Sequence, residues 1–232
     1  MVIKVKSIYV VFSATPYKMG RFIRGMTGNR WNHVSVSLSP QLAPMYSFAR
    51  VYRNTPFFAG FIHESLCRYS KLAEKDSEIR VCRVPVPDER YERVSLLLSD
   101  MSAHKERYLY NYVSAAFALF GVRLNIHGAY TCAEFAGDVL NVAGLEISYG
   151  AFHEIDEMAH LLSAYTIYEG ESARYPTSPS WGDDRFPQSV GLISGMTKTA
   201  SGFAKLTARG AGDAVRFLYG LTFSYVRSSR DD

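Results

Sequence analysis

Residues 129–135 read Ala-Tyr-Thr-Cys-Ala-Glu-Phe, and this stretch decides how the middle of the chain is expected to fold. Thr131 stands three residues before Glu134 and just ahead of an apolar-periodic run, which is the pattern of a capping box. The pattern predicts a helix with Thr131 as its N-cap and Cys132 as its first residue. A thiol there faces free backbone N–H groups and the positive end of the helix dipole, which favour the reactive thiolate. The sequence therefore predicts a nucleophile at Cys132.

A purely structural role for Cys132 stays open at this point. Cys132, Phe135, Ala136 and Val139 recur at helical spacing, so the cysteine could belong to the buried stripe of its helix. Free cysteine is among the residue types that proteins bury most often. A second residue with a matching chemical role is needed to separate a nucleophile from a packed thiol.

Residues 32–38 supply that second residue. They alternate polar and apolar side chains, which predicts a strand with His33, Ser35 and Ser37 on one face. A cysteine nucleophile needs a base that takes its proton and returns it to the leaving group. Of the six histidines, His33 is the one whose neighbours predict a polar cleft, so we pair it with Cys132.

The motif Trp-Asn-His-Val-Ser at 31–35, followed by the cysteine motif at 130–135, resembles the circularly permuted NlpC-type cysteine hydrolases. These are papain-like enzymes in which the histidine strand precedes the cysteine helix. Residues 45–50 and Gly60-Phe61 are also similar to uncharacterised bacterial members, and the resemblance covers about residues 7–170. It implies an α+β fold, with a small antiparallel sheet and the cysteine helix packed against it.

The resemblance also implies roles for individual residues. Cys132 is the nucleophile, and His33 is the general base and then the general acid. A third polar residue on the strand after the histidine strand orients the imidazole. That strand offers Ser47 or Tyr46, and Glu64 is the nearest carboxylate but lies further along the chain. We assign the third catalytic role to Ser47, which departs from the amide, histidine or acid that the family uses.

Other residues complete the expected site. The backbone N–H of Cys132 would belong to an oxyanion hole, since a helix start supplies donors where negative charge develops. Tyr130 and Tyr46 are expected to contact substrate, with a packed aromatic as the alternative for Tyr130. Glu134 is assigned to the capping box. No metal and no cofactor are expected, because the acidic and histidine cluster at 153–160 lacks the order of a zinc-binding helix.

Three functions are compatible with these residues. The first is a cysteine peptidase or amidase that cleaves a peptide or amino-acyl amide of the cell-wall type through a thioester. The second is a lipid acyl hydrolase or acyltransferase, because lecithin:retinol acyltransferase-like proteins are similar permuted relatives. The third is a binding protein with a degenerate site, which the unusual third residue would explain.

The 232 residues suit one domain with an appendage. We expect a hydrolase domain at 1–170, a linker rich in Pro and Ser at 171–188, and a Gly-rich amphipathic tail at 189–232. Strands expected early and helices expected later favour α+β over alternating α/β. The expected strands are 7–13, 32–38, 45–52 and 78–84, and the expected helices are 87–102, 111–120, 131–142 and 155–164.

Charge and cysteine usage predict the partners and the location. Residues 1–63 carry eight Lys or Arg and no acidic residue, which favours a small anionic peptide or acyl substrate, or a merely solvated basic surface. These basic residues are dispersed and lack a binding motif, so nucleic acid is not expected. Three cysteines without metal-ligand spacing, no convincing signal peptide and no span of roughly 20 apolar residues predict a cytoplasmic protein. The tail could contact a membrane surface, dock on the domain or stay disordered.

Overall fold

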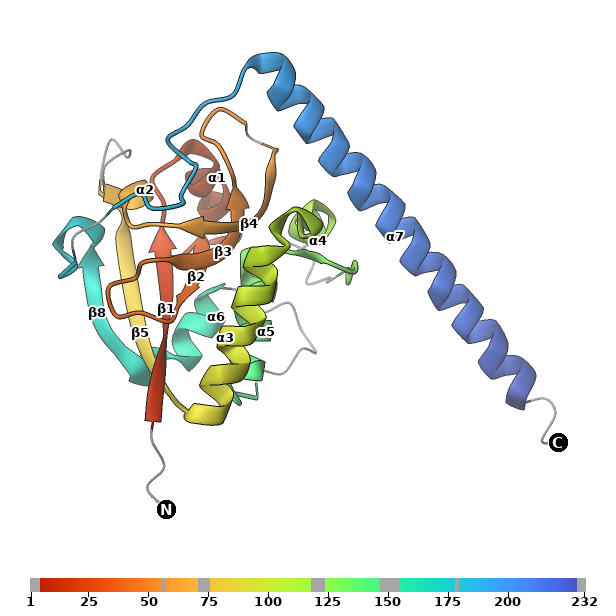
Figure 1. Cartoon of the computed structure of the whole chain (residues 1–232), viewed down its shortest axis with the longest axis horizontal. Coiled ribbons are helices and arrows are strands. Elements are labelled where there is room, and N and C mark those ends of the chain that lie inside the picture. Colours follow the sequence, from red (N-terminus) through yellow and green to blue (C-terminus); the bar gives the residue numbers. More distant parts are fainter. Residues whose placement is uncertain are drawn as a thin grey trace.

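An eight-stranded sheet forms the centre of the computed structural model, which describes residues 5–55, 57–70, 76–117, 124–146, 155–177 and 180–228 (Figure 1). The strands follow the order β7-β6-β4-β3-β2-β1-β5-β8, and all pairs are antiparallel except β6 with β7. The strands are β1 (Val5–Ala14), β2 (His33–Ser37), β3 (Met45–Arg50), β4 (Ala59–Glu64), β5 (Glu78–Pro87), β6 (Leu109–Tyr110), β7 (Ala129–Tyr130) and β8 (Thr166–Glu171).

Helices pack on this sheet and flank it. They are α1 (Lys18–Thr27), α2 (Cys67–Ser70), α3 (Asp88–Ala103), α4 (Tyr112–Phe117), α5 (Cys132–Val142), α6 (Ile155–Leu161) and α7 (Leu192–Ser228), with short 3-10 turns at Lys105–Arg107, Ser163–Tyr165 and Ser172–Arg174. Helix α5 packs on β2 and β3, and α3 packs on β1, β4 and β5. The expected mixed α+β fold is confirmed. The sheet is larger than expected, because β4, β6, β7 and β8 add to the four strands that the sequence predicts.

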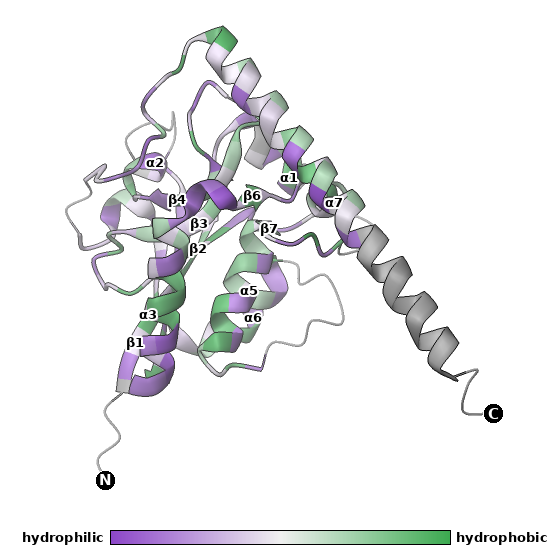
Figure 2. Ribbon diagram, turned by 45° about the vertical axis from the view of Figure 1, so that its right-hand side comes forward, coloured by the Kyte–Doolittle hydropathy of each residue, from purple (hydrophilic) through white to green (hydrophobic). Residues whose placement is uncertain are grey.

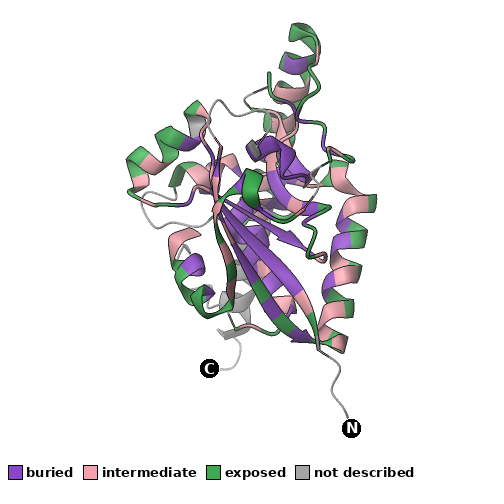
Figure 3. Cartoon of the chain, turned by 90° about the vertical axis from the view of Figure 1, so that its left-hand side faces the viewer, coloured by how far each residue is buried: buried purple, intermediate pink, exposed green. Residues whose placement is uncertain are grey.

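The long strand β1 shows how the sheet separates two cores. Its side chains alternate, so Ile8, Val10 and Phe12 join the core under α3, α5 and α6, whereas Tyr9 and Val11 join a second core on the opposite face. Figure 3 shows the central strands almost entirely buried. A strand with apolar residues on both faces requires cover on both sides, and this chain provides it.

Helix α5 begins as the sequence predicts. The hydroxyl of Thr131 accepts a hydrogen bond from the backbone N–H of Glu134 at 3.2 Å, and the Glu134 carboxylate accepts one from the backbone N–H of Thr131 at 2.7 Å. The capping box is therefore confirmed, with Cys132 as the first helical residue. Beyond the other end of the helix, Gly144 has a φ of 92°, a left-handed conformation that glycine adopts without strain.

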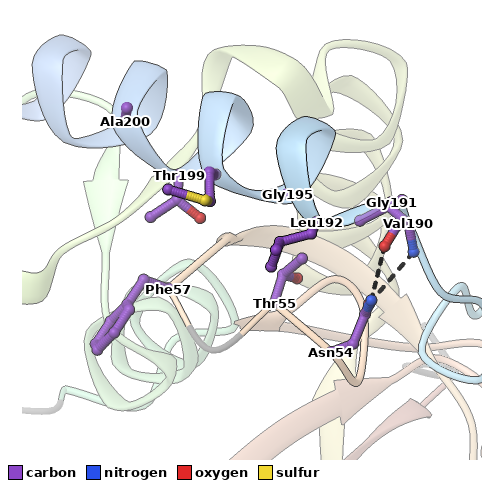
Figure 4. A pocket seen from close by; sticks show the side chains of 10 residues that line it. Asn54, Thr55, Phe57, Val190, Gly191, Leu192, Gly195, Thr199 and Ala200 are labelled. Atoms are coloured by element: carbon purple, nitrogen blue, oxygen red, sulfur yellow. Dashed lines mark hydrogen bonds between the residues drawn. The ribbon is translucent and has the colours of Figure 1, made fainter.

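Helix α7 contains most of the expected tail and is attached to the domain. Before its first turn, the Asn54 side chain donates to the carbonyl of Val190 at 2.7 Å and accepts from its N–H at 3.3 Å (Figure 4). Further along, Leu206 packs in a small core with Ile126 and its neighbours, and Arg209 donates to the carbonyl of Arg107 at 2.8 Å. The first part of α7 thus docks on the domain, one of the three alternatives for the tail.

Hydropathy is mixed along α3, α5 and the part of α7 whose residues are coloured (Figure 2). Among the described residues, no helix combines the length and the apolar character that crossing a membrane requires. The segment 171–188, which its composition predicts to be a linker, carries four buried residues in its described part, Ser172, Tyr175, Asp184 and Phe186. These side chains attach that segment to the domain, and two of them help to form the site.

Candidate active site

The structure brings Cys132 and His33 together. Cys132 is the first residue of α5, and His33 is the first residue of β2, on which α5 packs. The two side chains are 6% and 8% exposed, and Cys132 contributes, after Glu64, to the raised pKa of His33. Both residues line one cavity of about 370 Å³. Two residues far apart in sequence, selected for complementary chemistry, therefore share a nearly buried site.

Glu64 lies behind the histidine. It is the last residue of β4 and is 2% exposed, and its two carboxylate oxygens lie 3.1 and 3.2 Å from Nε2 of His33. Its oxygen Oε1 also accepts hydrogen bonds from the hydroxyls of Ser35 and Tyr69, the latter at 2.9 Å. A buried carboxylate is stable only when donors satisfy it, and here three side chains do so. Because Glu64 occupies Nε2, the other ring nitrogen of His33 is left for the thiol.

The electrostatics of His33 and Glu64 favour the charged form of both side chains. Burial lowers the pKa of His33, but the negative charge of Glu64 and hydrogen bonds from Cys132 and Glu64 outweigh it and raise that pKa to about 10. Burial raises the pKa of Glu64, but the charge and hydrogen bond of His33, the charge of Arg68 and the Ser35 hydroxyl lower it to about 2. The site therefore holds an imidazolium beside the thiol, an arrangement that favours the nucleophilic thiolate in cysteine enzymes.

Ser47 does not take the position that we expected beside the imidazole. Its buried hydroxyl donates to the backbone carbonyl of Val34 at 2.7 Å. The reason is register: β2 and β3 pair at Val36 and Tyr46, which sets Ser47 beside the interior of β2 rather than its first residue. Among the described side chains, the carboxylate that contacts His33 belongs to Glu64.

Tyr46 and Tyr130 lie in the aromatic core next to the site. The Tyr46 ring stacks on Phe61 at a centroid distance of 6.1 Å, and the Tyr130 ring lies 5.2 Å from that of Phe48. Among the described residues that line the cavity, neither tyrosine is found, although Phe48 is. Contact of either tyrosine with substrate stays a prediction.

Aromatic side chains form a large part of the cavity wall. Helix α1 contributes Phe22, and Phe57, Tyr110 and Tyr112 line other parts of the wall. Burial and then the proximity of Cys132 raise the pKa of Tyr110, so that phenol stays neutral beside the sulfur. Walls of this kind accept the apolar part of a ligand and exclude water from the reacting groups.

Two arginines, Arg50 and Arg68, also line the cavity, and they differ in their ion pairing. Arg68 forms a bidentate ion pair with Asp184, whose carboxylate oxygens lie 2.7 Å from Nε and 2.6 Å from the terminal nitrogen Nη2. Both side chains are at most 5% exposed, so this pair neutralises itself inside the protein. Arg50 lines the same cavity, and no acidic side chain among the described residues forms an ion pair with it.

The acidic cluster at 153–160 serves the fold where it is described. Residues 153 and 154 lie outside the described residues. Asp156 accepts hydrogen bonds from the backbone N–H groups of Arg30 at 2.7 Å and Trp31 at 2.9 Å, which ties α6 to the segment before His33. Within the described ranges, no three His, Cys, Asp or Glu side chains are grouped so that they could hold a metal ion.

Sequence reasoning named Glu64 but ranked it below Ser47, because Glu64 lies further along the chain. A signal for it was present: residues 59–64 read Ala-Gly-Phe-Ile-His-Glu, a short strand pattern that ends in an acid. Recognising that strand would have placed a carboxylate at the end of a neighbour of β3. Arg50, Arg68 and Asp184 had no comparable signal, because their proximity depends on the packing of residues 180–188.

No family model, curated protein or solved structure matches this chain. The resemblance to permuted NlpC-type hydrolases therefore rests on the motifs around His33 and Cys132. Any function assigned to the chain has to rest on the geometry of the site.

Proposed function

We propose that the protein is a cysteine hydrolase with a permuted papain-like fold of the NlpC type. Cys132 is its nucleophile, His33 its acid and base, and Glu64 the positioning residue that holds the imidazole. One observation carries the proposal: the Glu64 carboxylate contacts Nε2 of His33 at 3.1 Å, and the same imidazole lines one cavity with Cys132. A nucleophile, a base and a group that orients the base are the three parts of a covalent hydrolase site.

The reaction follows from these groups. The Cys132 thiolate attacks the carbonyl carbon of an amide, and the backbone N–H of Cys132 at the start of α5 stabilises the oxyanion. The His33 imidazolium donates its proton to the amine as the carbon–nitrogen bond breaks, which leaves a thioester. Neutral His33 then takes a proton from water, and the resulting hydroxide attacks the thioester. The acid product leaves as the thiolate and the imidazolium are restored.

Peptide or amino-acyl amides of the cell-wall type are the substrates that we favour, and their carboxylates would suit the basic cavity wall. A nucleophilic thiol has to stay reduced, so we place the protein in the cytoplasm. The proposal requires no cofactor and no metal.

A lipid acyl hydrolase or acyltransferase is the second candidate, and one observation favours it. Apolar side chains at the edge of the cavity are exposed to water, with Phe22 61% exposed and Phe57 48% exposed. Exposed apolar side chains next to a site are typical of surfaces that receive apolar ligands. Comparing hydrolysis of an amino-acyl p-nitroanilide with that of a long-chain acyl ester in micelles separates the two candidates.

The first test measures the reactivity of the thiol. Iodoacetamide alkylation of Cys132 is followed by peptide mass spectrometry between pH 5.5 and 9 in wild type, His33→Ala and Ser47→Ala. We expect rapid alkylation at pH 6 in wild type and in Ser47→Ala, and a rate at least about 10-fold lower in His33→Ala, because the imidazolium is lost. Cys67 and Cys82, both buried and free, serve as internal controls for unfolding in the same digest.

If the alkylation rate in His33→Ala equals that of wild type across this pH range, His33 does not activate Cys132. The result would then favour a binding protein on a hydrolase-like scaffold. Activity then tests catalysis directly. Cys132→Ala is expected to abolish turnover of any substrate that wild type hydrolyses, because the covalent step has no substitute. Full activity in that variant contradicts the mechanism.

A further inference from the structure

Arg50 is a half-buried cation in the wall of the active-site cavity. It is the last residue of β3, and its guanidinium lies 6.0 Å from the ring of Tyr17 and 5.5 Å from that of Phe186. Within the described ranges, no acidic side chain pairs with it, although Arg68 nearby is paired with Asp184. A guanidinium packed between aromatic rings keeps its charge but has donors to spare for a ligand.

The neighbourhood of Arg50 makes an anion favourable there. Burial, followed by the positive charge of Arg68, lowers the pKa of Arg50, so its cationic form lacks compensation. Tyr112 lines the same cavity, and its buried hydroxyl has no hydrogen-bond partner in the described structure. Burial raises the pKa of Tyr112, and the positive charge of Arg50, which lines the same cavity, opposes that rise. Unpaired buried donors are unfavourable, and an anion that accepts from both would relieve them.

We infer that Arg50 and Tyr112 bind the anionic group of an acyl substrate, a carboxylate or a phosphate, whose carbonyl carbon lies at Cys132. The cavity contains all three residues, so one ligand can reach Arg50 and the thiol together. The aromatic wall at Phe22 and Phe57 takes the apolar part of the ligand. The position of the carbonyl rests on the proposed function, whereas anion binding at Arg50 does not. A planar guanidinium fits either anion with two parallel hydrogen bonds.

Binding by the full-length wild-type protein tests this inference without turnover. The probes are octyl phosphate, octanoate, neutral octanol and inorganic phosphate, each below its micellar concentration and measured by titration calorimetry. We expect Arg50→Gln to weaken octyl phosphate or octanoate binding by roughly 10- to 100-fold, the usual effect of losing a charged hydrogen-bond donor. Tyr112→Phe should weaken it by roughly 2- to 10-fold, because only a neutral hydroxyl is removed.

Arg53→Gln is the matched control, since Arg53 is an exposed arginine three residues along the chain and lies outside the cavity wall. It should change binding by less than about 3-fold, as expected for a screened surface charge. Equal binding in wild type and Arg50→Gln, or octanol binding as tight as octyl phosphate, overturns the inference. Inorganic phosphate binding as tightly as octyl phosphate also overturns it, because the site would then recognise a free anion and not the apolar chain that the substrate requires.

Turnover separates this inference from the proposed function. Mono-p-nitrophenyl glutarate and p-nitrophenyl valerate have acyl chains of equal length, and only the first carries a terminal carboxylate. Arg50→Gln should lower kcat/KM for the glutarate ester by roughly 10- to 100-fold more than it lowers kcat/KM for the valerate ester. If wild type hydrolyses neither ester while octyl phosphate binding still depends on Arg50, the hydrolase proposal fails and the anion site stands.

Discussion

The two faces of the sheet bury different chemistry. The face under α3, α5 and α6 is an apolar core in which Val34 and Val36 of β2 meet Phe135 of α5. The opposite face combines apolar residues with buried charges, since Tyr69 of its core donates a hydrogen bond to Glu64. Strand alternation assigns the residues of β2 to these faces, with Ser35 reaching Glu64 between two valines that point the other way.

The difference teaches how the site is assembled. Apolar packing on one face fixes the helix that presents Cys132, whereas hydrogen bonds and ion pairs on the other face hold Glu64. His33 is the first residue of β2. At this end of the strand its ring contacts Glu64 from one side of the sheet and lies close to Cys132 from the other. Substitutions on the two faces should therefore affect stability and thiol reactivity differently.

The largest loss of stability is expected from a substitution on the apolar face. Phe135 is 1% exposed, and its ring centroid lies 5.4 Å from that of Phe48 and 5.7 Å from that of Phe61. We expect Phe135→Ala to lower the free energy of unfolding by about 3–5 kcal/mol, because it leaves a cavity under α5. Urea denaturation measures this. A loss below about 1 kcal/mol would mean that the packing around Phe135 is loose.

The next largest loss of stability is expected from a substitution on the charged face. Glu64→Gln keeps the shape of the side chain but removes the charge beside His33. We expect a loss of about 1.5–3 kcal/mol near pH 6, as for a hydrogen bond to a charged group. Alkylation of Cys132 at that pH should also slow, because the pKa of His33 falls without its carboxylate. Unchanged alkylation would show that Glu64 has no influence on the thiol.

The pH dependence of stability sharpens the same comparison. His33 has a raised pKa, so its stabilisation is complete below its unfolded value of 6.5 and is lost as pH rises through about 10. Glu64 has a lowered pKa, so its stabilisation is complete above 4.5 and is lost as pH falls through about 2. Both contribute fully between pH 4.5 and 6.5. We expect the decline in unfolding free energy between pH 6.5 and 10 to be smaller in Glu64→Gln than in wild type.

A smaller effect is expected at Thr131, the N-cap of α5. Thr131→Ala removes the hydroxyl that accepts the N–H of Glu134 and should lower the free energy of unfolding by about 1 kcal/mol. Cys132 alkylation at pH 6 should decrease by less than in Glu64→Gln, because His33 and Glu64 keep their contact. Thr131→Ser, which retains the hydroxyl, is the matched control and should behave as wild type does in both measurements.

The smallest effect on thiol reactivity is expected at Ser47, on the charged side of β3. Ser47→Ala leaves the carbonyl of Val34 without this donor and should lower the free energy of unfolding by about 0.5–1.5 kcal/mol. The rate and pH dependence of Cys132 alkylation should not change, because the hydroxyl does not contact His33. A shift in that pH dependence as large as in Glu64→Gln would restore Ser47 as the residue that orients the imidazole.

Sequence alone carried the local features of the fold. Thr131 and Glu134 predicted the start of α5, because a capping box involves residues three apart whose contacts form within one turn. The alternation at 32–38 likewise predicted β2. The strands β4 and β6 were not predicted: the pattern of β4 is brief, and β6 has two residues and pairs with β4, which is distant in the chain.

The pairing of Cys132 with His33 could also be anticipated from the sequence, since a capped cysteine and a histidine on a polar strand face are complementary in chemistry. The sequence also carries a signal for Glu64, but it does not decide between Glu64 and Ser47, because the register of β2 with β3 and the position of β4 depend on contacts that form only in the folded sheet. Tertiary structure therefore set Glu64 rather than Ser47 against His33, brought Arg68 to Asp184, and left Arg50 without an acidic partner among the described residues. Local hydrogen bonds are encoded within a few residues, whereas the environment of a buried charge is set by every segment that packs around it.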